Sequence, residues 1–295
     1  MSKPDCFDIF VGIGEGKFKE FENTVKDGVI NINEKYGKEG FTALYFACSK
    51  NIDLKNKIKW IKLITSLGAD VNAKISTGIS PLDLAIDRGD TDLIKILVEV
   101  GANIHEKNNG TSLLFFANDE KTIKCLVKYG LDLNLKNNNG MTPLENAIRR
   151  RNKEAIKCLV KLGAIVGAID DNSNTAIAMA VGNVEIIKYL VELGINVDII
   201  DKTGETGMHM AAAEGDNNSI KCLASLGANI NARNNQGFSP IFYSAMNGHI
   251  ESMKCLKSLG ADINTKNNDG KTMISFFGND IKPEVLKWLK ANGVR

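Results

Sequence analysis

The sequence predicts an all-α solenoid, in which about nine similar helix–turn–helix units stack along one axis. Three observations lead to this fold class. A short phrase, Ile or Met followed by Lys-Cys-Leu, occurs four times, and its cysteines Cys125 and Cys158, like Cys222 and Cys255, are 33 residues apart. A glycine follows each cysteine after five residues, and a polar stretch then leads to Gly-x-Thr/Ser-Pro-Leu. A fixed order of phrases at a fixed period is typical of stacked repeats.

Each unit carries the signals of two short helices. In the fifth unit Thr142 can cap a helix that begins at Pro143, because proline is tolerated in the first turn of a helix. Apolar residues then recur on one face of a first and a second helix, at Leu144, Ala147 and Ile148 and at Ile156, Leu159 and Val160. Gly163 is placed to end the second helix in a left-handed conformation. One unit cannot bury these faces alone, so neighbouring units must stack.

The repeat covers nearly the whole chain, and we predict a single solenoid over residues 1–295. Counted by its closing glycines, it has an N-terminal capping repeat at 1–37, seven internal repeats at 38–267 and a C-terminal capping repeat at 268–295. A length of 295 residues is too great for one compact core, but the core of a solenoid grows in one dimension. We therefore expect no second domain.

Three units depart from the period. Gly40 and Gly78 are 38 residues apart, which predicts an insertion near Ser49–Lys57. Two other units are shortened, to 30 residues between Gly110 and Gly140 and to 31 between Thr175 and Thr206. We expect the missing residues mainly at the turn between the two helices. One position of the first helix is a small residue in five units, which lets the paired helices approach closely: Ala47, Ala85, Ala147, Ala180 and Ala211. Phe116 interrupts this column, so the fourth unit should be locally distorted.

These phrases resemble the ankyrin repeat, whose signature is a 33-residue period with Thr-Pro-Leu-His-x-Ala opening the first helix. Pro81, Pro143 and Pro240 keep the proline, and only the phrase Thr206-Gly207-Met208-His209 keeps the histidine. The resemblance implies an ankyrin-repeat solenoid with a hairpin finger in each unit, such as the turn from Asn134 to Gly140. It also implies that partners bind on the concave side, at the finger tips and the first helices.

Composition and charge exclude several classes of protein. Hydrophobic residues make up 43% of the chain and charged residues 24%, which is ordinary for a folded protein. The formal net charge is only +2, so we do not expect a nucleic-acid partner. No apolar run approaches a membrane span, and the first residues lack the apolar stretch of a signal peptide. These features predict a cytoplasmic, intracellular protein, and they leave open an effector that is secreted without a cleaved signal.

No pattern of reactive residues predicts a catalytic, cofactor or metal site. The six cysteines form no C-x-x-C pair, and Cys125, Cys158, Cys222 and Cys255 occupy a core column of the second helix, where we expect buried, reduced thiols. The three histidines lie in different units. The glycine-rich stretch from Gly12 to Gly16 has Lys17 where a dinucleotide-binding loop needs glycine. We therefore predict that the chain is not an enzyme.

The resemblance directs attention to finger tips and to the exposed ends of first helices as the sites that bind a partner. At these positions we predict nine partner-binding residues: Ile79, Met141, Arg149, Arg150, Arg151, Ile169, Ile200, Phe238 and Met246. Ile169 and Ile200 belong to a column that is otherwise basic, with lysine or arginine at 74, 107, 136, 233 and 266. The consecutive arginines suit acidic groups on the partner, because a guanidinium can donate two parallel hydrogen bonds.

The sequence thus favours a monomeric, non-catalytic scaffold or adaptor for a protein partner that carries some acidic groups. A regulatory subunit that inhibits an enzyme, or a host-directed effector, would use the same surface and has the same sequence features. Binding of nucleic acid through the basic column is a further alternative, which steep salt dependence of binding would favour.

Overall fold

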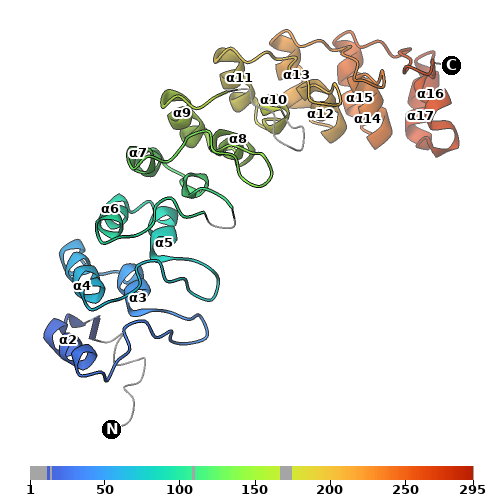
Figure 1. Cartoon of the computed structure of the whole chain (residues 1–295). Helices are drawn as coiled ribbons and strands as arrows, with labels where there is room; N and C mark the ends of the chain where they lie inside the picture. Colours follow the sequence, from blue (N-terminus) through green and yellow to red (C-terminus); the bar gives the residue numbers. More distant parts are fainter. Residues whose placement is uncertain (1–11, 14, 108–109, 167–174, 295) are drawn as a thin grey trace. The chain divides into compact units, whose positions relative to one another are not determined.

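The computed structural model describes residues 12–13, 15–107, 110–166 and 175–294, and they form short helices joined by turns (Figure 1). Within these ranges the one extended pairing is an isolated bridge between Tyr36 and Phe41. The structure is therefore all-α, as predicted. The chain divides into two compact units, Met1–Asp132 and Leu133–Arg295. One continuous solenoid over 1–295 stays a prediction.

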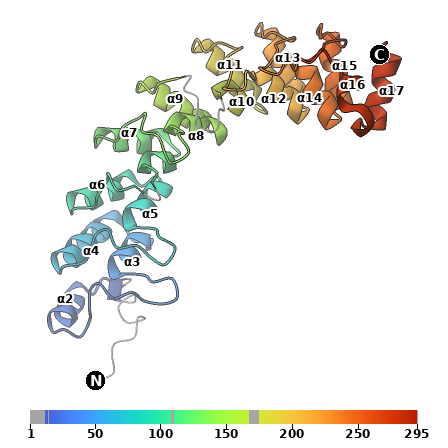
Figure 2. The same ribbon diagram turned by 45° about the vertical axis from the view of Figure 1, so that its right-hand side comes forward.

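The N-terminal unit has two rows of helices, which are visible in both views (Figures 1 and 2). The first helices of its repeats are α3 (Ala43–Ser49), α5 (Pro81–Asp87) and the 3-10 helix η1 (Leu113–Phe116). The second helices are α2 (Phe18–Lys26), α4 (Leu54–Ser66), α6 (Thr91–Glu99) and α7 (Glu120–Lys128). Each helix packs on the next of its own row, and α3, α5 and η1 also pack on the second helix of their own repeat.

The C-terminal unit continues the same pattern. Its first helices are α8 (Pro143–Arg149), α10 (Ala176–Met179), α12 (Gly207–Glu214), α14 (Pro240–Asn247) and α16 (Met273–Phe277), which is followed by the 3-10 turn η2 (Gly278–Asp280). Its second helices are α9 (Lys153–Lys161), α11 (Val184–Glu192), α13 (Asn217–Ser225), α15 (Ile250–Ser258) and α17 (Pro283–Ala291). The first helices pack one on the next from α8 to α16, and the second helices do so from α11 to α17.

The first helices begin where the sequence predicts. Thr142 Oγ1 accepts a hydrogen bond from the backbone N–H of Glu145 at 3.3 Å, and Glu145 Oε2 accepts one from the N–H of Thr142 at 2.7 Å. Pro143 is the first residue of α8. This capping box satisfies two backbone donors that the helix cannot pair itself, and it fixes the start of the helix.

The core lies between the two rows of helices. Ala47, Ala85, Ala180 and Ala211 are fully buried, and Ala147 is 6% exposed. Small side chains at this position let the backbones of neighbouring first helices approach closely. The predicted alanine column is thus confirmed, and its apolar neighbours complete a core that runs along each unit.

The three departures from the period have different structural forms. The fourth repeat has the 3-10 helix η1 in place of a first α-helix, and Phe116 is 38% exposed, so the predicted distortion is confirmed. The location that we predicted for the missing residues was wrong. Helix α10 has four residues where α8 has seven, whereas the turn after α10 is not shortened, since it runs from 180 to 183 and the turn after α8 from 150 to 152. The first helix shortens because this turn must still bring the second helix back onto the core. The insertion near Ser49–Lys57 mainly lengthens α4, to 13 residues.

The fingers are tight turns that main-chain hydrogen bonds close. The N–H of Asn137 donates to the carbonyl of Met141 at 2.9 Å, and Asp201 donates to Glu205 at 3.0 Å. A glycine with positive φ precedes the closing residue in both, at Gly140 and Gly204. The turn needs a left-handed backbone conformation at this position, which glycine adopts without steric cost. The fingers therefore hold the next residue at a fixed place beside the first helix.

Candidate binding surface

Fingers and first helices form one surface in each unit, which we call the finger and first-helix surface. Three of the predicted partner-binding residues are exposed apolar side chains on it. Ile79 lies just after the finger glycine in the N-terminal unit and is 37% exposed. In the C-terminal unit Ile200 lies on a finger and is 54% exposed, and Met246 lies near the end of α14 and is 43% exposed. These three side chains are available to a partner.

Two of the predicted residues are not exposed, which corrects the sequence analysis. Met141 is 4% exposed and Phe238 is 7% exposed. The ring of Phe238 packs 5.1 Å from that of Phe242 and 4.9 Å from that of Phe276, between centroids. Both side chains therefore pack inward, whereas Ile79 at the same position after a finger glycine is exposed. Ile169 lies outside the described residues.

The three consecutive arginines lie where α8 ends and turns toward α9. Arg149 is the last residue of α8, Arg150 is its C-cap, and Arg151 has a positive φ of 59°. All three side chains are exposed, as expected. Among the described residues none of their guanidinium groups has an ion pair or a side-chain hydrogen bond. The turn therefore presents three uncompensated arginines to solvent.

The basic column of the fingers has a structural role that the sequence did not reveal. The Nη1 of Arg233 donates to the carbonyl of Lys266 at 2.7 Å, and Nζ of Lys35 donates to the carbonyl of Lys74 at 2.7 Å. Lys74 in turn pairs with Glu106 at 2.7 Å. Lys74 and Arg233 of the column, and Lys35 on the preceding finger, thus join neighbouring fingers, which is a structural use of their charge.

A polar cluster on α14 and two fingers was also missed from the sequence. The hydroxyl of Tyr243 donates to Oε1 of Glu205, and Nδ2 of Asn234 donates to the Tyr243 oxygen at 3.0 Å. Burial and the bond to Glu205 raise the pKa of Tyr243. Tyr243 is half-buried, so one side of its ring faces solvent in a fixed orientation. Glu205 and Tyr243 are 38 residues apart, and no sequence pattern pairs them.

His209, the histidine of the repeat phrase, has a structural role. The backbone N–H of Thr206 donates to its Nδ1 at 3.0 Å, and Nε2 lies 3.0 Å from the carbonyl of Phe238. A backbone N–H can only donate, so Nδ1 must be unprotonated and Nε2 must carry the proton. Burial lowers the pKa of this imidazole. His209 thus joins two repeats as a neutral side chain and does not face solvent.

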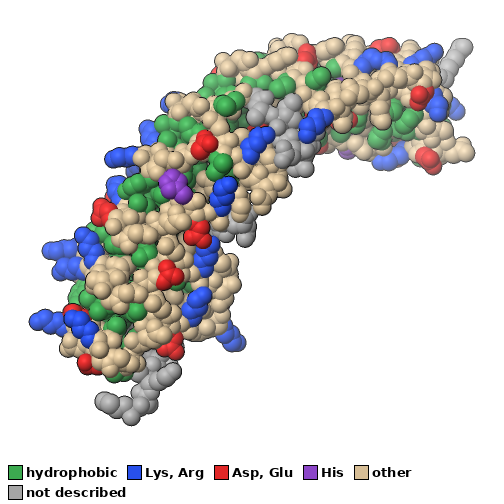
Figure 3. Space-filling view, viewed as in Figure 1, with side chains coloured by type: hydrophobic (Ala, Val, Ile, Leu, Met, Phe, Trp, Pro, Cys, Tyr) green, Lys and Arg blue, Asp and Glu red, His purple; other side chains and the backbone are tan. Residues whose placement is uncertain are grey.

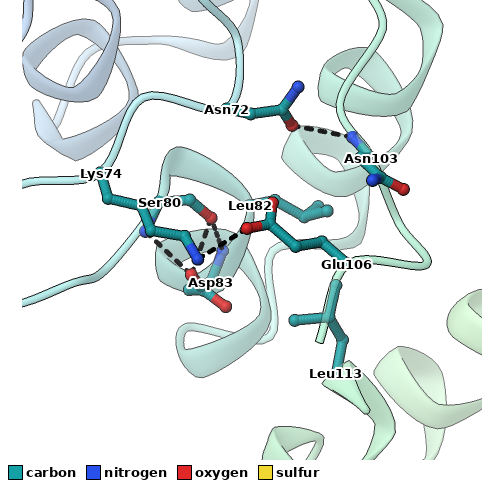
Figure 4. A pocket seen from close by; sticks show the side chains of 8 residues that line it. All are labelled: Asn72, Lys74, Ser80, Leu82, Asp83, Asn103, Glu106 and Leu113. Atoms are coloured by element: carbon teal, nitrogen blue, oxygen red, sulfur yellow. Dashed lines mark hydrogen bonds and ion pairs between the residues drawn. The ribbon is translucent and has the colours of Figure 1, made fainter. Parts of the chain in front are cut away.

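A small polar notch in the N-terminal unit shows no sign of catalytic chemistry (Figure 4). Its lining groups bond to one another. Ser80 and Asp83 form a capping box, Lys74 pairs with Glu106, and Oδ1 of Asn72 accepts the N–H of Asn103 at 2.8 Å. No nucleophile in the notch lies beside a free base, so its side chains serve the helix cap and the contact between fingers.

The cysteines are free thiols in the described structure, but only two of the four column cysteines are buried. Cys158 and Cys222 are buried, whereas Cys125 and Cys255 are intermediate. The expectation of burial is thus wrong for the latter pair. In the described ranges no cluster of His, Cys, Asp and Glu could hold a metal ion.

Charges of both signs are mixed on the face of the molecule that Figure 3 shows. No described helix is both long enough and apolar enough to cross a membrane. On the face drawn in Figure 3 the charges do not form the large single-sign field that typifies a dedicated nucleic-acid-binding face.

Two solved structures are similar to this chain. The ankyrin repeat domain of human ASB11 has a TM-score of 0.61 and 23% identity, and the alignment covers 72% of this chain and 98% of that chain. The ankyrin repeat domain of Bcl-3, a member of the IkappaB protein family, has a TM-score of 0.58 and 22% identity, with 71% and 99% covered. These likenesses show the fold.

Comparison with protein sequences gives the family. Human transient receptor potential cation channel subfamily A member 1 is 24% identical over 113 residues, which are 37% of this chain and 10% of the channel. The chain thus matches about a tenth of that relative's length. A model of three ankyrin repeats matches residues 113–201 and 177–267, and a model of one ankyrin repeat matches residues 77–109. These matches cover more than half of the chain, which therefore belongs to the ankyrin-repeat family.

Proposed function

We propose that this chain is a non-catalytic protein-binding scaffold or adaptor, which binds its partner with the finger and first-helix surface. Ankyrin repeats are protein-interaction modules, and the placement of exposed apolar side chains supports this use of the surface. Large exposed apolar side chains in the described structure are Val29, Leu54, Ile79, Phe116, Ile165, Ile200, Met246 and Phe276. Five of these eight lie on fingers or first helices, and only Leu54 lies in a second helix.

Such side chains suit the anchors of a protein interface. Each exposed apolar side chain that a partner covers loses contact with water, which contributes about 25 cal/mol per Å² of apolar area. Anchors contribute most when the surface around them is already rigid, because less side-chain entropy is then lost on binding. The hydrogen bonds that fix Tyr243 between Glu205 and Asn234 supply this rigidity on the C-terminal unit.

A charge placed at two anchors tests the proposal. A tagged full-length chain captures its partner from the native source, and the purified partner is then titrated against the wild type and against Ile200→Asp/Met246→Asp. Both sites are exposed, so the fold should persist, and loss of two anchors should weaken binding about tenfold or more. The control is Lys221→Asp, on the exposed face of the second helix α13.

The outcome is decided by comparing the two variants. Unchanged affinity in the double variant, or an equal loss in Lys221→Asp, would contradict binding through the finger and first-helix surface. If the partner is an enzyme, its catalytic activity is measured in the same titration. Loss of that activity on binding would make this chain a regulatory inhibitor.

A further inference from the structure

The turn after α8 differs from the matching turn of the other repeats. The left-handed position between the two helices is glycine in four other repeats, at Gly89, Gly182, Gly215 and Gly248. Arg151 takes this position with φ of 59° and is the only non-glycine residue with positive φ among those described. A side chain in this conformation costs roughly 1–2 kcal/mol relative to a right-handed residue. The fold alone would be better served by glycine.

The choice of arginine is also unusual for this chain. The sequence has 31 lysines and six arginines, and three of those six are Arg149, Arg150 and Arg151. A turn that needed only positive charge for solubility could use lysine, as the rest of the surface does. Arginine differs from lysine in its planar fork, which matches a carboxylate with two parallel hydrogen bonds.

Within the described part of the chain, no side chain pairs with these forks. Arg149 is in the last turn of α8, where a cation is favourable to the helix dipole, but this accounts for only one of the three. The neighbouring Lys153 is already paired with Glu185 at 2.6 Å. By contrast, Arg88 occupies the C-cap position of α5, as Arg150 does in α8, and its Nη1 donates to the carbonyl of Ser49 at 2.9 Å.

We infer that the arginine turn, Arg149–Arg151, is a recognition site for a carboxylate-rich segment of the protein partner. The inference rests on the proposed function and adds the chemistry of one contact to it. The guanidinium of Arg151 lies over Gly182, where a Cβ would come within 2.4 Å of Nη2. This third fork is thus directed toward the next repeat, while Arg149 and Arg150 are exposed at the end of α8. An acidic segment that crosses the turn meets all three.

The test uses a fluorescent glutamate-rich peptide and a single-stranded DNA of equal net charge, each titrated at low and at physiological salt. The peptide should bind the wild type, and Arg149→Ala/Arg150→Ala should weaken it about tenfold or more, because desolvated guanidinium contacts are lost. Arg88→Ala is the matched control and should leave peptide affinity unchanged. Arg149→Lys/Arg150→Lys keeps the positive charge but not the planar guanidinium. Its affinity for the peptide should lie between those of the wild type and the alanine variant.

Three outcomes would overturn the inference: no peptide binding by the wild type, equal loss in Arg88→Ala, or tighter binding of DNA than of peptide with the same dependence on Arg149 and Arg150. Circular dichroism of each variant verifies that it is folded. Failure here is separable from failure of the scaffold proposal, because a partner that still depends on Ile200 and Met246 would support the scaffold without the acidic contact.

Discussion

Replacing Arg151 by glycine should make the protein more stable than replacing it by alanine. The reason is the backbone of Arg151, which has φ of 59° in a turn where four other repeats use glycine with φ between 67° and 87°. Alanine keeps the Cβ that makes this conformation unfavourable, and glycine removes it. Both variants lose the guanidinium that lies over Gly182, so that contact cancels in the comparison.

The expected magnitude follows from two opposing effects. Relief of left-handed strain favours the glycine variant by roughly 1–2 kcal/mol. The greater freedom of glycine in the unfolded chain opposes this by about 0.5–1 kcal/mol. The free energy of unfolding of Arg151→Gly should therefore exceed that of Arg151→Ala by about 0.5–1 kcal/mol.

Urea unfolding followed by circular dichroism measures this difference, with equal slopes in urea as the condition for comparing the two variants. Gly182→Ala is the reverse change, because it puts a Cβ at the matching turn, where φ is 87°. The atoms that this Cβ would meet belong to the flexible end of the Arg151 side chain. It should cost about 1 kcal/mol. An alanine variant at 151 that is as stable as the glycine variant would refute the assignment of strain to this residue.

Three further predictions concern the core and the buried polar groups. Burial lowers the pKa of His209, so below its ordinary value of about 6.5 the unfolded chain binds a proton that the folded imidazole does not. The free energy of unfolding should fall as the pH drops below about 6.5, and His209→Gln should flatten that part of the pH profile. Gly207→Ala should cost about 1–3 kcal/mol in urea unfolding, because its Cβ would lie 2.5 Å from Cγ2 of the buried Ile177. A bulky thiol reagent should label Cys255 faster than Cys158 under native conditions, since Cys158 is 2% exposed, and equal rates would contradict that burial.

The repeat period predicted the elements of the fold because each phrase carries its own physical signal. Thr142 and Pro143 specify where α8 starts, and Gly163 ends the second helix with φ of 96°. These signals are local, so they are readable in one sequence. The repetition of the phrases then requires that the units stack.

Positions that depend on contacts between repeats were harder to predict. Met141 and Phe238 follow a finger glycine and are buried, whereas Ile79 at the same position is exposed, so the position alone does not predict exposure. The shortening of α10 followed from the need to keep the turn, which the count of residues does not show. Gly207 replaces the proline of the repeat phrase because Ile177 of the preceding repeat fills the space beside it, and that contact exists only in three dimensions.

Some features of the candidate site could likewise be predicted from the sequence, and others could not. Exposure of Ile200, Met246 and the three arginines could be predicted from their places in the repeat. The cluster of Tyr243, Glu205 and Asn234 could not, since its members come from two fingers and one helix. That the arginine turn has no side-chain partner among the described residues also required the structure, because an arginine at the same helix end, Arg88, is paired.

Amide hydrogen exchange on the complex with the captured partner tests the central claim most directly. The claim is that the partner covers fingers and first helices. Exchange should slow, relative to the free chain, in the finger around Ile200 and in the residues of α12 and α14. It should be unchanged in the second helices α13 and α15. Protection confined to the second helices would contradict the proposed binding surface.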